Sequence, residues 1–231
     1  MPYVPSGGEE ATFLKNFDPS KYKNPAVAAD TALFAADGDA LKILLIRRGG
    51  YPYKGRWALP GGFVNIDEDV RVSAQRELQE ETGVSGIYIE QAFVWAVPDR
   101  DPRQRVIAVS YIGLAPFEKF KAVAGDDAAQ AEWFAIKGYE ETEVNGGVTA
   151  RYTLSGAETL HPVVSYPSGR LQEISRVQSG GLAFDHAESI AFSLNTLRHR
   201  ALEGRFLEFA LENEADREKV QKAIKKAFVR E

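Results

Sequence analysis

The chain contains no cysteine, and this absence removes several kinds of chemistry. A protein of 231 residues without thiols can form no disulfide bond, no thiolate nucleophile and no cysteine-ligated zinc site. Its three histidines, His161, His186 and His199, are dispersed and do not have the spacing of zinc ligands. The composition fits a reducing compartment, and we expect a cytoplasmic protein.

Long apolar runs and a strong excess of one charge are also missing. No segment approaches the roughly 18 consecutive apolar residues of a membrane span, and residues 1–13 lack the basic and apolar regions of a secretory signal. The formal net charge of −5 does not favour a nucleic-acid partner. The motifs GxSxG, GxxxxGK[ST] and GxGxxG do not occur. We therefore expect neither a membrane nor a nucleic acid as a partner.

The order of polar and apolar residues predicts strands mixed with a few helices. Strands are expected at residues 27–35, 41–48, 87–97, 106–114 and 131–136, and helices at 69–82, 184–202 and about 215–230. The expected organisation is a polar lead-in (1–25), one layered domain (26–183) and C-terminal helices (184–231) that pack on this domain or form a small appendage. This mixture indicates an α/β or α+β fold.

One predicted helix carries a concentration of acidic residues. Residues three and four apart share a face of a helix, so Glu77, Glu80 and Glu81 project together. Ala74 and Leu78 lie on the adjoining side, where they can pack on a sheet. Crowded carboxylates repel one another unless a cation lies among them. Hard divalent ions such as Mg²⁺ prefer oxygen ligands, so the helix is a candidate metal site.

A glutamate-rich helix is more often a solvated surface, and the segment RELQEE alone would favour that interpretation. The wider pattern favours a site instead. Gly62 is followed after five residues by Glu68 and, after seven more, by RELQEETGV, which runs from Arg76 to Val84. Arg76 can hold a carboxylate by a two-pronged ion pair, and Gly62 lets the backbone come close to a ligand. This combination is not expected by chance in a chain of this length.

These residues match the signature of the Nudix hydrolases at every defining position, so the chain resembles this family over residues 26 to about 140. The resemblance implies an α/β/α sandwich with a mixed β-sheet. It also implies a loop–helix–loop that binds Mg²⁺ or Mn²⁺. The implied reaction is hydrolysis of a nucleoside diphosphate linked to another group, X, because bound metal ions neutralise a diphosphate and acidify water.

The resemblance assigns a role to each charged residue of the motif. Glu80 and Glu81 would be the principal metal ligands, and Glu77 a further ligand or an assisting base. Arg76 and Glu68 would brace the helix. We expect these five residues to form the catalytic machinery.

Two positions outside the helix are also implied as metal ligands. The backbone carbonyl of Gly62 would complete the metal shell. Glu132 precedes Trp133-Phe134 on a predicted strand and matches a position that reaches the metal in several relatives. The alternative for Glu132 is an ordinary exposed strand residue.

Residues around the motif suggest a substrate. Pro98 lies 15 residues after Gly83, which resembles the ADP-ribose pyrophosphatase branch of the family. The loop PDRDPR resembles a subgroup that contains ADP-ribose hydrolases and regulators of NAD metabolism. The expected substrate-binding residues are Arg48, Pro98, Arg100 and Asp126. Each of them could instead be an ordinary loop or strand-end residue.

The favoured function is hydrolysis of ADP-ribose to AMP and ribose 5-phosphate. One alternative is an ADP-ribose-sensing transcriptional regulator with a C-terminal winged helix. Another is hydrolysis of a nucleotide sugar or a dinucleotide polyphosphate. The intact motif favours an enzyme, and so do the 45 residues after His186, which leave little room for a winged helix. The resemblance also implies a homodimer.

Overall fold

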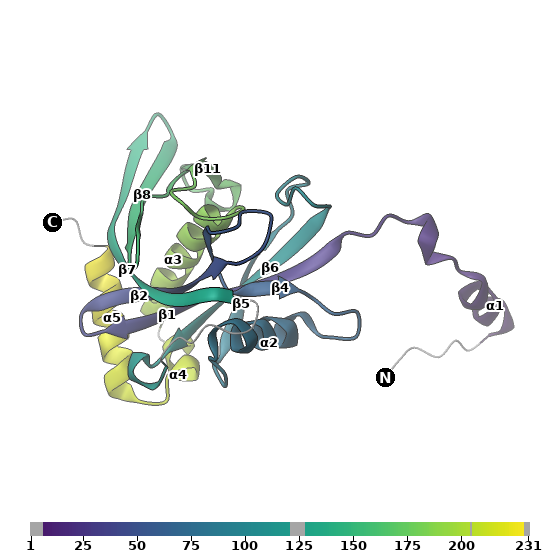
Figure 1. Cartoon of the computed structure of the whole chain (residues 1–231), viewed down its shortest axis with the longest axis horizontal. Coiled ribbons are helices and arrows are strands. Elements are labelled where there is room, and N and C mark those ends of the chain that lie inside the picture. The colour runs from purple at the N-terminus through teal and green to yellow at the C-terminus, as the bar shows by residue number, and fades with distance from the viewer. Residues whose placement is uncertain (1–6, 121–127, 204, 229–231) are drawn as a thin grey trace.

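The computed structural model describes residues 7–120, 128–203 and 205–228, and these form one large β-sheet with helices around it (Figure 1). The strands are β1 (Ala26–Asp37), β2 (Ala40–Arg48), β3 (Trp57–Ala58), β4 (Gly61–Phe63), β5 (Ile89–Trp95), β6 (Val106–Ala115), β7 (Ala128–Val144), β8 (Gly147–Ser155), β9 (Thr159–Leu160), β10 (Val163–Pro167) and β11 (Ser175–Gln178). The helices are α1 (Gly8–Asn16), α2 (Val70–Thr82), α3 (His186–Glu203), α4 (Arg205–Ala210) and α5 (Glu214–Ala227).

The sheet is mixed. Its strand order is β11-β10-β8-β7-β2-β1-β6-β5, while β3 pairs with β2, β4 with β1 and β9 with β8. β1 runs parallel to β6 but antiparallel to β2 and β4. The parallel pairing places the start of β1 beside the start of β6, and β4 lies against the same end of β1. The motif loop and the start of β6 therefore meet at one end of the sheet.

Helices cover both faces of the sheet. Successive residues of a strand point to opposite faces, so Leu33 packs in the apolar cluster beneath α2 and Phe34 packs in the cluster beneath α3. On β2, Leu44 likewise packs beneath α2 and Ile43 packs beneath α3. Figure 1 shows α2 across the sheet from α3, α4 and α5. The α/β/α sandwich with a mixed sheet is confirmed.

The motif helix α2 begins and ends where its sequence predicts. The Asp69 side chain accepts a hydrogen bond of 2.9 Å from the Arg71 N–H, which caps the amino end. Gly83 ends the helix in the left-handed conformation, with φ 72°. Ala74 and Leu78 are buried against the sheet. Their contacts fix the rotation of α2 and turn its glutamates toward β4.

The C-terminal helices share a core with the sheet. The apolar stripe of α5, which includes Val220, Ala223 and Ile224, is buried in the same cluster as Leu41 and Phe134 of the sheet. In the parts of the chain that the structure describes, no helix is long and apolar enough to cross a membrane.

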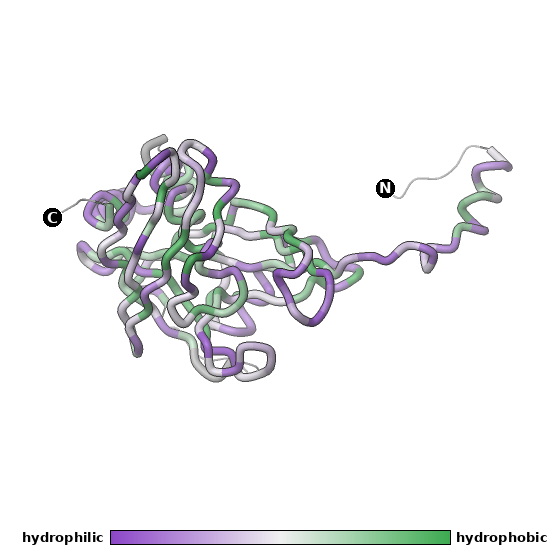
Figure 2. Tube along the Cα trace, turned by 90° about the horizontal axis from the view of Figure 1, so that it is seen from above, coloured by the Kyte–Doolittle hydropathy of each residue, from purple (hydrophilic) through white to green (hydrophobic). Residues whose placement is uncertain are grey.

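The N-terminal segment is an arm that leaves the sheet at β1 (Figure 1). Its helix α1 has no buried residue. Figure 2 shows the arm as a largely hydrophilic extension with a short apolar stretch, away from the apolar strands of the body. Phe13 and Tyr22 are each 62% exposed. The sequence predicted an extended lead-in here, and helix α1 was missed.

Two other elements differ from the sequence predictions. The strand expected at 131–136 is part of the much longer β7, which turns at Asn145-Gly146 into β8. Both turn residues have positive φ, 53° and 75°, as the predicted hairpin turn requires. The short helix α4 was not predicted. It follows α3 closely and contacts it.

A buried carboxylate near the start of α3 makes the stability of the fold depend on pH. Glu188 is 8% exposed, and within the described residues its Oε2 is buried without a hydrogen-bond partner. Burial raises the pKa of Glu188 from 4.5 to about 7. This folded-state pKa lies above the unfolded value. The contribution of Glu188 to stability is therefore greatest below about pH 4.5 and is lost as the pH rises through about 7.

Glu188→Gln is expected to raise the free energy of unfolding by about 1–3 kcal/mol at pH 8 and by much less at pH 5, because only the ionised side chain is costly to bury. Urea denaturation at both pH values would measure this difference. Glu118→Gln, an exposed site, is the control and should change neither value. An equal effect of Glu188→Gln at both pH values would contradict the prediction.

Candidate active site

Arg76 and Glu68 tie the loop before α2 to the helix. The Arg76 Nε donates to Glu68 Oε1 over 3.0 Å, and Nη2 donates to Oε2 over 3.0 Å. The Ser73 hydroxyl donates to Glu68 Oε2 over 2.6 Å. These contacts lower the pKa of Glu68 to about 2, and the hydrogen bonds from Arg76 have a larger effect than the one from Ser73. The carboxylate is fully ionised at neutral pH and holds the loop against the first turns of α2.

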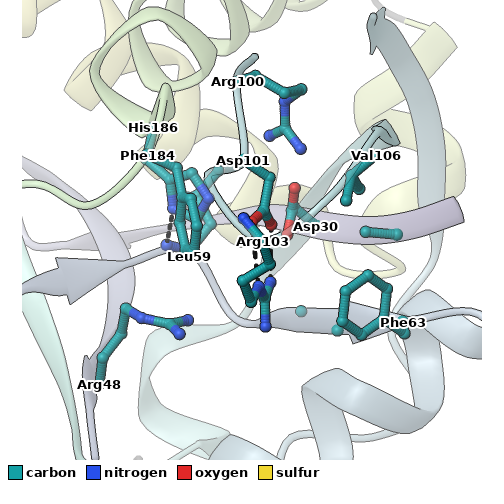
Figure 3. Close-up of a pocket in the computed structure, with 13 residues that line it drawn as sticks. Asp30, Arg48, Leu59, Phe63, Arg100, Asp101, Arg103, Val106, Phe184 and His186 are labelled. Atoms are coloured by element: carbon teal, nitrogen blue, oxygen red, sulfur yellow. Dashed lines mark hydrogen bonds and ion pairs between the residues drawn. The ribbon is translucent and has the colours of Figure 1, made fainter. Parts of the chain in front are cut away.

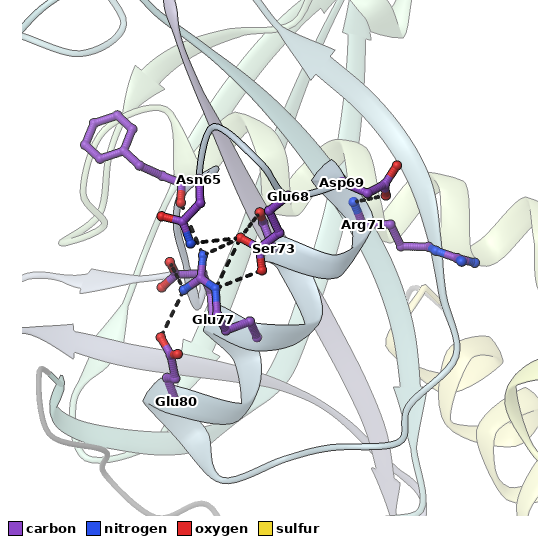
Figure 4. Close-up of polar contacts among 9 residues, drawn as sticks. Asn65, Glu68, Asp69, Arg71, Ser73, Glu77 and Glu80 are labelled. Atoms are coloured by element: carbon purple, nitrogen blue, oxygen red, sulfur yellow. Dashed lines mark hydrogen bonds and ion pairs between the residues drawn. The ribbon is translucent and has the colours of Figure 1, made fainter. Parts of the chain in front are cut away.

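The same guanidinium also binds two other glutamates of the helix (Figure 4). Arg76 Nη1 donates to Glu77 Oε1 over 2.7 Å and to Glu80 Oε2 over 3.0 Å. Arg76 thus gathers Glu68, Glu77 and Glu80 on one side of α2. Across residues 7–120, 128–203 and 205–228, no three acidic or histidine side chains converge closely enough to form a metal site.

Glu81 projects separately, into the turn between β3 and β4. Its Oε2 accepts a hydrogen bond of 2.8 Å from the Gly61 N–H. Burial raises the pKa of Glu81 to about 8, and repulsion from Glu77 and Asp30 adds to this effect. A cation beside Glu81 would relieve that repulsion and favour the ionised carboxylate.

Gly62 makes room for the Glu77 carboxylate. A Cβ atom at Gly62 would lie 2.5 Å from Glu77 Oε1, closer than any tolerable contact. The backbone of Gly61-Gly62 is therefore flanked by carboxylates from α2. Carboxylate and carbonyl oxygens are the ligands of hard divalent cations. The donor set and its electrostatic repulsion fit such an ion.

These two glycines are among the residues that line a hollow (Figure 3). It encloses roughly 520 Å³, including its open mouth. Its polar and aromatic walls come from five separate segments of the chain. They comprise Asp30, Arg48, Phe63, Arg100, Asp101, Arg103, Phe184 and His186.

One wall of the hollow is fixed by a buried ion pair. Arg100 Nε and Nη2 donate to the two carboxylate oxygens of Asp185 over 2.7 Å and 2.5 Å. Next to it, His186 Nδ1 accepts from the Leu59 N–H over 2.8 Å, and burial lowers the pKa of His186 to about 4. Arg100 and His186 therefore hold the wall in place, and Asp185 lies directly before the first residue of α3.

Arginines and aromatic rings form another part of the wall. Arg103 Nη2 pairs with Asp101 over 2.7 Å, and its guanidinium carbon lies 4.8 Å from the centroid of the Phe63 ring. Arg48 lies 4.7 Å from the centroid of the Phe184 ring. Burial and then repulsion from Arg103 lower the pKa of Arg48. Two neighbouring cations that repel each other favour an anionic ligand.

Phe184 is held in a strained conformation. Its φ of 47° is rare for a bulky residue. The ring packs edge-on against Tyr53, with centroids 4.7 Å apart. Local strain of this kind is often found where a side chain must be placed for binding.

One known protein family has a model that matches this chain. The model of the NUDIX domain matches residues 24–152, more than half of the chain. The chain belongs to the Nudix family. Its motif helix α2 is thus the Nudix helix, and Glu77, Glu80 and Glu81 are the Nudix glutamates.

Three Nudix relatives are similar to this chain. An ADP-ribose pyrophosphatase of Methanocaldococcus jannaschii is 43% identical over 126 residues, which cover 53% of this chain and 71% of that protein. The ADPR responsive transcriptional repressor NtrR of Acinetobacter baylyi is 36% identical over 130 residues, which cover 55% of this chain and 52% of the repressor. This chain thus spans about half the length of that repressor.

The third relative is a solved structure. It is the NUDIX domain of Shewanella oneidensis NrtR in complex with ADP ribose. It superposes with a TM-score of 0.56 at 26% identity, and the match covers 81% of this chain and 98% of that domain.

Only some of the predicted substrate-binding residues line the hollow. Arg48 lines the hollow, and Arg100 lines it while bound to Asp185. Pro98 is exposed and is not among the residues that line the hollow. Asp126 lies outside the described residues.

Glu132 lies away from the Nudix glutamates. It pairs with Leu45 of β2. Its neighbour Trp133 packs toward α2, whereas Phe134 packs toward α3. Glu132 shares the face of Phe134 by strand alternation, and its Oε1 lies 3.0 Å from where a Cβ on Gly156 would be. The structure does not bring it to the Nudix helix.

Sequence reasoning missed several residues of the hollow, among them Asp30, Asp101 and Phe184. Asp30 could have been found, because a lone acid in the apolar strand VAADTALFA is unusual and therefore informative. Asp101 and Phe184 gave no such signal. Asp101 lies in a charged loop, and the role of Phe184 depends on a backbone conformation that its neighbours impose.

Proposed function

We propose that this protein is a metal-dependent pyrophosphohydrolase that cleaves a nucleoside diphosphate linked to X, with ADP-ribose as the substrate. Water adds across one P–O bond of the diphosphate, and the products are AMP and ribose 5-phosphate. The observation that carries this proposal is the braced Nudix helix beside the hollow. Glu81 and Glu77 flank the Gly61-Gly62 backbone, and that backbone forms one wall of the hollow.

Glu77, Glu80, Glu81 and the Gly62 carbonyl would hold Mg²⁺ or Mn²⁺, and the three side chains, which do not converge in the described structure, would turn toward the ion. Such an ion supplies charge neutralisation at the diphosphate and a more acidic bound water. Arg76 and Glu68 keep the amino end of α2 in place, so the glutamates are positioned before substrate arrives.

ADP-ribose as the substrate is supported by the relatives and by the hollow. Two relatives are named for their action on, or response to, ADP-ribose, and the third is a complex with it. Arg48 and Arg103 both line the hollow and repel each other electrostatically. Two arginines with aromatic rings behind them suit a phosphorylated, ring-bearing ligand.

A regulator that senses ADP-ribose is the second candidate. The similarity to the repressor NtrR favours it, since a sensor and a hydrolase can share one ligand site. The two functions differ in a DNA mobility shift. Only a regulator would bind a DNA fragment with an affinity that changes when ADP-ribose is added.

A substrate panel tests the proposed function. ADP-ribose, a nucleotide sugar, a dinucleotide polyphosphate and an oxidised nucleoside triphosphate would be incubated with Mg²⁺ or Mn²⁺, and the products separated by chromatography. We expect AMP and ribose 5-phosphate from ADP-ribose, slower reactions with the others and no reaction in EDTA. A faster reaction with another substrate would contradict the choice of X. Gel filtration of the same sample would test the expected homodimer.

A further inference from the structure

Asp30 is a buried carboxylate that faces the hollow. It lies on β1 within an apolar run and is 8% exposed. It is one of the residues that line the hollow (Figure 3). Throughout the described parts of the chain, no protein group forms a hydrogen bond or an ion pair with its carboxylate. The Asp30 oxygens are not among the fully buried atoms that lack a partner, so they are open to the hollow and can accept a hydrogen bond from a ligand.

The position of Asp30 is tightly fixed. Strand alternation places it on the face of Ala32, which packs beneath α3, and not on the face of Ala29, which packs beneath α2. Its Oδ1 lies 2.6 Å from the position that a Cβ on Gly61 would occupy. The carboxylate therefore fills the space left by the glycine, at the border between the Nudix glutamates and the hollow.

In the described parts of the chain, the arginines that line the hollow donate hydrogen bonds to groups other than Asp30. Both carboxylate oxygens of Asp185 bind Arg100, whose side chain is 5% exposed. Asp101 binds Arg103. Arg48 Nε donates to the Pro52 carbonyl over 2.9 Å. The oxygens of Asp30 remain available to a ligand.

The charges of the walls restrict what that ligand group can be. Arg100 and Arg48 already act on Asp30 as positive charges, so a further cationic group beside it would be disfavoured. An anionic group would be repelled by Asp30 itself. A neutral donor remains, and two neighbouring sugar hydroxyls present two O–H donors to the two oxygens of one carboxylate.

We propose that Asp30 accepts hydrogen bonds from the hydroxyls of the sugar in X, and that it thereby selects a diphosphate linked to a polyhydroxylated sugar. The inference rests on the proposed function, because it assigns a recognition role within the same site. Asp30 is a specificity-determining residue that acts on X and not on the diphosphate.

Two substrates and one isosteric variant test this assignment. The substrates are ADP-ribose and ADP esterified with tetrahydrofurfuryl alcohol, which keeps a five-membered ring but has no hydroxyl on it. Asp30→Asn preserves the shape of the side chain and removes its charge. Asp99→Asn, at an exposed position outside the hollow, is the matched control.

For ADP-ribose, Asp30→Asn is expected to raise KM by roughly 10–100-fold with little change in kcat, the range for losing a hydrogen bond to a charged group. For the ester, KM should not change, and the preference for ADP-ribose should largely disappear. Asp99→Asn should behave as the wild type. Calorimetry with ADP-ribose in EDTA should show the same loss of affinity in Asp30→Asn.

Three results would overturn the inference. The first is an equal effect of Asp30→Asn on both substrates. The second is weaker binding of Mn²⁺ alone by Asp30→Asn, which would make Asp30 part of the metal site. The third is unchanged affinity for ADP-ribose in calorimetry. If the wild type binds ADP-ribose without hydrolysing it, the proposed function fails while calorimetry still decides the role of Asp30. Absence of binding would overturn both.

Discussion

Glu81→Gln is expected to remove most of the turnover and to leave the fold intact. Glutamine can still accept the hydrogen bond from the Gly61 N–H, which Glu81 accepts over 2.8 Å, so the turn between β3 and β4 should keep its shape. The charge that would hold a divalent cation is lost. The expected reduction in kcat is about 10²–10⁴-fold, or roughly 3–5 kcal/mol.

This loss would be measured as kcat with saturating ADP-ribose and Mg²⁺, with thermal unfolding as the test of the fold. Glu143→Gln, at an exposed position near the end of β7, is the matched control and should have wild-type kcat. A folded Glu81→Gln protein with wild-type turnover would refute the assignment of the Nudix glutamates.

Gly61→Ala is expected to have the largest effect on stability of any alanine substitution in the motif loop. The new Cβ would lie 2.3 Å from the Ala29 carbonyl oxygen and 2.7 Å from the Asp30 Cα, both of which are backbone atoms of β1 that cannot move aside. The φ of 156° adds strain. Overpacking and strain together should lower the free energy of unfolding by about 2–4 kcal/mol.

Urea denaturation would measure this loss, with Gly55→Ala as the control. Gly55 also has a positive φ, 82°, but no atom lies within 4 Å of its added Cβ. The Gly55→Ala variant should therefore lose only the conformational cost of a side chain at positive φ, which is about 1 kcal/mol in the free energy of unfolding. Equal losses in the two variants would show that the close approach of β4 to β1 does not matter.

The sequence predicted the elements that its own periodicity defines. The Nudix helix was placed within one residue, because Ala74 and Leu78 mark its buried face and Gly83 marks its end. The C-terminal stripe that includes Val220 and Ile224 was also recognised and is buried as expected. Helix α1 was missed, because it has no buried face and so leaves no apolar period in the sequence.

The hollow was less predictable than the helix because its walls depend on contacts between distant residues. Arg100 seemed suited to bind substrate, but its Nε and Nη2 donate to Asp185, 85 residues away. Glu132 matched a family position, but strand alternation turns it to the α3 side. Such pairings follow from the register of the sheet and the docking of α3, which a single sequence does not show.

The pairing of Arg100 with Asp185 has a consequence for how this protein is made. The Nudix helix and the loop after β5 leave the ribosome well before the start of α3, so a nascent chain can carry the glutamates without a finished wall beside them. Before Asp185 has been synthesised, Arg100 lacks this carboxylate partner and the wall of the hollow is incomplete. The wall that Arg100 and Asp185 form is therefore completed later in synthesis than the Nudix helix beside it.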